Sequence, residues 1–102
     1  MDSTTFIKVQ KCKRNKDQKL DLSGSSISLI PADVMTLTTL RELDLSNNRL
    51  QSIDPNISNL TNLNYLNISN NCIKELPSSL ADLTTLQYLN VAGNPLDDIF
   101  LP

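Results

Sequence analysis

The chain has 102 residues, a formal net charge of −2, two Cys, no Trp and no His. This length allows one small domain rather than two, and the many Leu and Ile residues exclude a disordered chain. The absence of His, of a Gly-rich phosphate loop and of any zinc-ligand spacing argues against an enzyme and against a bound cofactor or metal. No small-molecule substrate is therefore expected.

Charge is distributed unevenly along the chain. The first 19 residues sum to +4, whereas the remaining 83 residues sum to −6. A basic segment of this kind can bind nucleic acid or an anionic membrane. However, no aromatic residues that could stack on bases are interleaved with the lysines, and the acidic remainder opposes wrapping of nucleic acid. The favoured interpretation is a solvated face, with neither nucleic acid nor a membrane as partner.

Residues 1–19 are predicted to form a basic N-terminal cap. Between Ser3 and Arg14, the apolar residues Phe6, Ile7 and Val9 are typical of an amphipathic helix. An additional strand would also cover the open end of the unit that follows. Of these two possibilities we expect the helix.

Both cysteines are predicted to be reduced thiols. Cys12 lies in the basic segment and Cys72 far from it, without the clustered cysteines that cap secreted repeat proteins. The chain also begins without the apolar run of a signal peptide, so we expect a cytoplasmic protein. The lysines around Cys12 could lower the pKa of its thiol and make it reactive. An inert thiol is the favoured alternative.

From Leu20 onward, the same residue types recur every 23 residues. The units are residues 20–42, 43–65 and 66–88, with a partial unit at 89–102. Two aliphatic columns read Leu20, Leu43, Leu66, Leu89 and Leu22, Leu45, Ile68, Val91. Because side chains alternate along a strand, these columns share one face and the polar residues between them lie on the other. A single unit cannot bury its apolar face, so we expect the units to stack around a continuous core.

The second half of each unit is predicted to return along the opposite side. Leu80, Leu83 and Leu86 follow Pro77 at three-residue spacing, which suits a 3₁₀ or short helical turn. An Asn column separates the strand from this return. We predict that Asn48, Asn71 and Asn94 form a structural ladder, because an Asn amide can bond backbone groups that the turn exposes. Ser25 takes this position in the first unit.

The segments Leu40–Leu50, Leu63–Ile73 and Leu86–Leu96 resemble the LxxLxLxxNxL signature of leucine-rich repeats. Leu76-Pro77 followed by Leu80 is similar to the LPxxL units of intracellular, Ras-suppressor-like repeat proteins. The resemblance covers residues from about 17 to 100. It implies an α/β fold, a short right-handed solenoid with a parallel β-sheet on its concave face and 3₁₀ or short helical turns on its convex face.

The polar side of the sheet is the predicted protein-binding surface, because the families that the chain resembles bind on this side. Its candidate contact residues are Lys19, Asp21, Glu42, Asp44, Ser46, Tyr65, Asn67, Ser69, Tyr88 and Asn90. Tyr65 and Tyr88 are expected side by side on strands about 4.8 Å apart, and paired exposed tyrosines are good interface anchors. Asp21 and Asp44 are expected to neighbour each other in the same way.

The predicted function is a non-enzymatic protein-protein interaction module, a cytoplasmic signalling or scaffold adaptor that binds a protein on its concave face. Two alternatives remain open. The chain could be a fragment or a self-associating solenoid, a homo-oligomer formed through an open C-terminal edge. It could also be the regulatory repeat domain of a larger enzyme.

Overall fold

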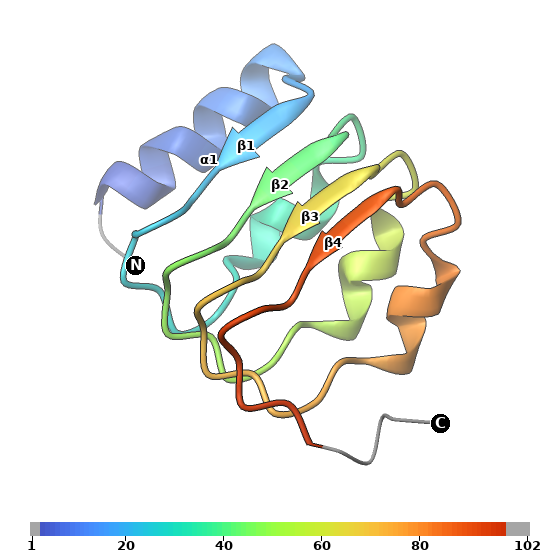
Figure 1. Ribbon diagram of the computed structural model, residues 1–102. Helices are drawn as coiled ribbons and strands as arrows, with labels where there is room; N and C mark the ends of the chain where they lie inside the picture. Colours follow the sequence, from blue (N-terminus) through green and yellow to red (C-terminus); the bar gives the residue numbers. More distant parts are fainter. Residues whose placement is uncertain (1–2, 98–102) are drawn as a thin grey trace.

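A single parallel sheet organises the molecule, and the predicted solenoid fold is confirmed (Figure 1). The computed structural model describes residues 3–97. The strands β1 (Lys19–Asp21), β2 (Glu42–Asp44), β3 (Tyr65–Asn67) and β4 (Tyr88–Asn90) lie side by side in chain order. The connections carry 3₁₀ helices, which are η1 (Ala32–Thr36), η2 (Pro55–Asn59) and η3 (Ser78–Asp82). Residues 98–102, part of the last predicted unit, lie outside the described residues.

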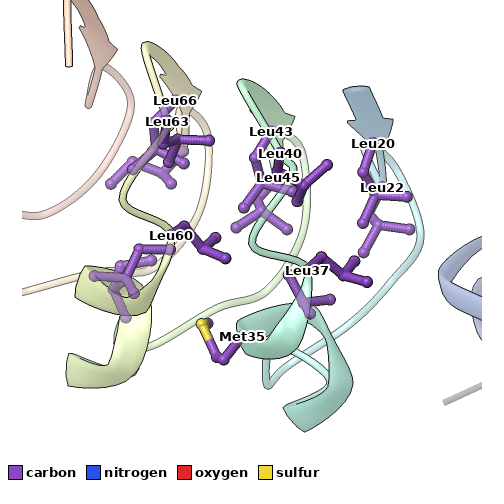
Figure 2. Packing of buried hydrophobic residues seen from close by; sticks show 14 of the residues in the cluster. Leu20, Leu22, Met35, Leu37, Leu40, Leu43, Leu45, Leu60, Leu63 and Leu66 are labelled. Carbon is purple, nitrogen blue, oxygen red and sulfur yellow. The ribbon is translucent and has the colours of Figure 1, made fainter. Parts of the chain in front are cut away.

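The register of the sheet follows the sequence repeat. Leu20 pairs with Leu43, Leu43 with Leu66 and Leu66 with Leu89, a shift of 23 residues each time. Leucines of one column therefore stack directly on one another and fill the space between the sheet and the 3₁₀ helices (Figure 2). The predicted entry into the third return also holds, because Pro77 is the residue that precedes η3.

The asparagine column bonds the backbone of successive turns together. Asn71 is buried, and its Nδ2 donates to the carbonyls of Leu45, Ile68 and Ser69 at 3.0 to 3.2 Å. Its Oδ1 accepts the amide of Leu50 at 3.0 Å. Asn48 and Asn94 make the corresponding bonds one unit earlier and one unit later. The amide thus satisfies backbone groups that would otherwise be buried without partners.

The residue before the ladder position has left-handed backbone in all four units. These residues are Gly24, Asn47, Asn70 and Gly93, with φ between 56° and 72°. Only Gly, and to a lesser extent Asn, adopts this conformation at little cost. The Gly and Asn residues of this column therefore mark the turn, a signal that the leucine columns do not contain.

The N-terminal cap is a helix, α1 (Ser3–Asn15), which lies along β1 (Figure 1). It buries Thr5, Val9 and Cys12, at the i, i+4 and i+7 spacing of one helix face. Phe6 and Ile7, which were predicted to share the apolar face with Val9, are instead 50% and 61% exposed. Ile7 lies about 160° around the helix from Val9, on the opposite side, whereas Phe6 lies about 60° from Val9, at the margin of the buried face.

Burial of the core decreases toward β4. The strand leucines Leu43 and Leu66 are fully buried, whereas Leu89 of β4 is 39% exposed. The neighbouring aliphatic residues Leu86 and Val91 are only partly buried. Strands β2 and β3 are covered on both sides by other units, while within residues 3–97 no unit covers the far side of β4.

Candidate functional site

The predicted contact residues all come from the strands and the positions just after them, so the register of the sheet places them in rows. Lys19, Glu42, Tyr65 and Tyr88 form the first row, and Asp21, Asp44, Asn67 and Asn90 form the second. Both rows lie on the polar side of the strands, opposite the leucines. We call this surface the concave face.

The second row has a structural role that the sequence prediction did not include. Asp44 Oδ1 accepts hydrogen bonds from the backbone amide of Ser46 at 2.9 Å and from its hydroxyl at 2.7 Å. Asn67 makes the same pair of bonds with Ser69. Each pair closes a turn that ends the strand. Ser46 and Ser69 are buried by this arrangement, so they offer little surface to a partner although they were predicted contact residues.

Tyr65 and Tyr88 form the most distinctive feature of the concave face. Their ring centroids are 4.5 Å apart and the two ring planes differ by 5°, so the rings stack face to face. The strand register pairs the two residues directly, which brings the rings together. Tyr88 is 44% exposed. Stacked rings lose little side-chain freedom when a partner binds, and they present a broad apolar surface with polar hydroxyl groups.

The other half of the concave face is charged. Lys19 Nζ lies 3.2 Å from Glu42 Oε2, and the Lys19 side chain is largely solvated whereas that of Glu42 is partly buried. Asp21 and Asp44 are register partners on β1 and β2. Hydrogen bonds from the side chain and the backbone amide of Ser23 lower the pKa of the Asp21 carboxyl.

A hollow of about 320 Å³ lies over the charged half and extends to the edge of the tyrosine pair. Its lining residues are Lys19, Leu20, Asp21, Glu42, Asp44 and Tyr65. The concave face therefore grades from a charged hollow on β1 and β2 to an aromatic surface on β3 and β4. The sequence prediction placed these residues on one face, and the structure brings them together.

The two cysteines differ in the environment of their thiols. Burial, and secondarily the charge of Asp17, raises the pKa of the Cys12 thiol, which is the opposite of what the surrounding lysines suggested. Cys72 is an exposed free thiol. Within residues 3–97 no three His, Cys, Asp or Glu side chains are grouped so as to hold a metal ion. Over the same residues, no helix has the length and apolar character needed to cross a membrane.

The model of the leucine-rich-repeat family matches residues 38–96. The chain belongs to the leucine-rich-repeat family. A solved leucine-rich-repeat protein of Leptospira interrogans is 34% identical, with a TM-score of 0.79 over 87% of this chain. An internalin of Listeria monocytogenes is 31% identical, with a TM-score of 0.60 over 69% of this chain. No curated protein sequence matches the leucine-rich-repeat chain closely enough to count as a relative.

The chain spans 23% of the length of the Leptospira protein and 20% of the length of the internalin. Four strands and their return turns are thus a small part of these two solenoids. The family supports a protein-interaction module in general terms. The match does not separate subclasses, so the Ras-suppressor-like LPxxL assignment stays a prediction.

Proposed function

We propose that the chain is a non-enzymatic interaction module that binds a protein partner through its concave face, with Tyr65 and Tyr88 as anchors. The stacking of these rings is the observation that carries the proposal. Large aromatic side chains usually pack into a core or bind a partner, and this pair lies on the polar side of the sheet. The Asp and Asn residues beside them are held in fixed turns, so the surface is ordered before binding.

The charged hollow is proposed to set the orientation of the partner. Its carboxylates have one oxygen occupied by the strand-end turns at Asp21 and Asp44, which leaves the second oxygen of each for a donor. Rim contacts of this kind affect orientation and association rate more than affinity. A typical partner buries about 20 to 30 residues on each side, more than four short strands supply. Convex-side or flanking segments are therefore proposed to contribute as well.

We propose a cytoplasmic setting, in which the module serves as a signalling or scaffold adaptor. The support is chemical, because both cysteines are free thiols and Cys72 is exposed. An exposed free thiol is compatible with a reducing compartment and is uncommon where disulfides form readily.

The proposal is tested by replacing both tyrosines with alanine. Partners of the wild-type chain are captured from lysate of the source organism and compared by mass spectrometry with those captured by Tyr65→Ala/Tyr88→Ala. A protein held by the tyrosines should be lost with the double variant. Far-ultraviolet circular dichroism should show an unchanged fold, because the rings lie outside the leucine core. Ile7→Ala is the matched control, since it removes an exposed apolar side chain from α1, away from the concave face.

Identical captured proteins for the wild-type and double-tyrosine variants would contradict the placement of the site. Loss of the same protein with Ile7→Ala would also contradict it. In either case a binding role for the family fold would stand, but on another surface.

Self-association through the β4 edge is the second candidate function. The supporting observation is the 39% exposure of Leu89, next to the partly buried Leu86 and Val91. A second copy could cover this edge, because an exposed strand edge pairs readily with another strand. Light scattering over a range of concentrations tests it, and a monomer at the highest concentration would contradict it.

A further inference from the structure

We propose that α1 docks on an anionic lipid membrane through the side of the helix that faces away from the solenoid. This side carries Ile7, Lys11 and Arg14, which follow one another at i, i+4 and i+7 and therefore form one line along the helix. We call this line the outer stripe. All three side chains are exposed, Ile7 to 61%. None of them belongs to the concave face.

The outer stripe is available because α1 packs by its opposite side. The helix contacts β1, and the residues that it buries are Thr5, Val9 and Cys12. The sequence predicted that Ile7 would share this packed face, which left only a solvated basic surface outside. With Ile7 outside, an apolar side chain lies in line with two cations. Helices that lie on membrane surfaces combine apolar and basic side chains in this way.

The charge of α1 is not neutralised within the described part of the chain. The helix contains four cationic side chains, all exposed, and no acidic residue. No ion pair within residues 3–97 includes a residue of α1. Two acidic residues contact the helix, and they do so from opposite sides. Lys8 Nζ donates to the backbone carbonyl of Asp21 at 3.4 Å, and Gln10 Nε2 donates to the carboxylate of Asp33 at 2.8 Å. Both contacts lie beside the outer stripe, which keeps its positive charge.

Size and shape favour a membrane over a folded protein at this surface. A stable protein interface uses about 20 to 30 residues on each side, whereas the outer stripe belongs to a single helix of 13 residues. A membrane surface has no fixed shape to match, and one amphipathic helix can lie in it. Nucleic acid phosphates could pair with the cations, but they offer no apolar contact to Ile7.

The distribution of charge orients the chain on such a surface. The first 19 residues sum to +4 and the remaining 83 sum to −6. An anionic membrane therefore attracts the end that carries α1 and repels the rest. Because the outer stripe points away from β1, the strands follow one another away from the lipid (Figure 1). Tyr65 and Tyr88 lie on the two strands farthest from it, so a concave-face partner and the membrane can be bound together.

The experiment is cosedimentation of the full chain with vesicles of phosphatidylcholine and phosphatidylserine, compared with vesicles of phosphatidylcholine alone. We expect binding to the anionic vesicles only, weakened at high salt because salt screens exposed charges. Lys11→Gln/Arg14→Gln should weaken binding by about tenfold or more, because each cation at an anionic surface contributes roughly fivefold. Arg41→Gln/Lys74→Gln is the matched control. It removes the same charge outside α1 and should bind like the wild-type chain.

Two further variants separate the apolar contact from the charges and from the concave face. Ile7→Ser should weaken vesicle binding by about threefold, because a side chain at the membrane surface is only partly removed from water. Tyr65→Ala/Tyr88→Ala should bind the anionic vesicles like the wild-type chain, which keeps this test independent of the proposed protein site. Far-ultraviolet circular dichroism checks the folding of each variant, and the replaced side chains of α1 are all exposed.

Three results would overturn the proposal. The first is equal binding, or none, to the anionic and the neutral vesicles. A poly-glutamate peptide or a short DNA duplex that binds in their place would then assign the outer stripe to an acidic protein or to nucleic acid. The second is an equal loss of binding for the two charge variants. The third is vesicle binding that Ile7→Ser leaves unchanged.

Discussion

Single asparagines hold neighbouring units together, and their contribution depends on burial. Asn71 serves three carbonyls and one amide and is buried. We expect Asn71→Ala to lower the free energy of unfolding by about 2 to 4 kcal/mol, because several buried backbone groups lose their partners. Asn94→Ala should cost only about 1 kcal/mol, because water can replace the amide at this partly exposed site. Urea unfolding measures both.

Asn59→Ala is the control for this comparison, since Asn59 is exposed at the end of η2. It should change the free energy of unfolding by less than about 0.5 kcal/mol. If Asn71→Ala and Asn59→Ala destabilise the chain equally, the ladder does not hold the units together.

At the residue scale, Cys12 also makes the stability pH-dependent. Burial raises the pKa of its thiol above the ordinary value of 9.0, so the unfolded chain releases this proton at lower pH than the folded chain does. The contribution of the protonated Cys12 thiol to the free energy of unfolding is therefore complete below about pH 9 and decreases as pH rises further. Urea unfolding between neutral pH and about pH 10 should show a steeper loss for the wild-type chain than for Cys12→Ala. Cys72→Ser should retain the wild-type slope, and an equal slope in all three chains would refute the assignment.

Some residue roles could be predicted from sequence and others could not. The role of the ladder asparagines could be predicted. An Asn that follows a β-strand in each stacked unit faces backbone carbonyls that repeat with the same 23-residue period. The role of Asp44 was harder to predict, because the same carboxylate can face a partner or close a turn with Ser46. The backbone after the strand places Ser46 where its amide and hydroxyl both donate to Asp44 Oδ1, so this oxygen closes the turn.

At the scale of the element, two substitutions in α1 test which face of the helix packs against the solenoid. Val9 is 1% exposed and Phe6 is 50% exposed. Val9→Ala should lower the free energy of unfolding by about 2 kcal/mol, because it leaves a cavity beside β1. Phe6→Ala should change it by less than about 0.5 kcal/mol, because the ring is solvated and Ala favours a helix. Thermal and urea unfolding of the two variants distinguish them, and a larger loss for Phe6→Ala would mean that the helix docks by another face.

The strands were predictable as elements, and the docking of α1 was not. Units of equal length can stack in only one register without separating their leucine columns, so pairing Leu43 with Leu66 follows from the repeat itself. The helix lacks such a repeat. Phe6, Ile7 and Val9 were predicted to form its apolar face, but of these three only Val9 is buried, together with Thr5 and Cys12.

At the scale of the whole molecule, stability should decrease along the solenoid toward β4. In a solenoid each unit is stabilised chiefly by its neighbours, and within residues 3–97 β4 has one neighbour while β2 has two. Native-state hydrogen exchange should therefore report a lower opening free energy for the amide of Tyr88 than for that of Leu45. Equal protection of the two amides would indicate that the four units unfold as one cooperative body.

The pairing of Tyr65 with Tyr88 also makes the concave face directly visible to spectroscopy. The chain has no Trp, and these are its only two Tyr residues. The near-ultraviolet circular dichroism and the intrinsic emission of the protein therefore originate almost entirely from one stacked pair of rings. Any molecule that reaches the rings, separates them or excludes water from them will change that signal, so an unlabelled sample can report occupancy of this face.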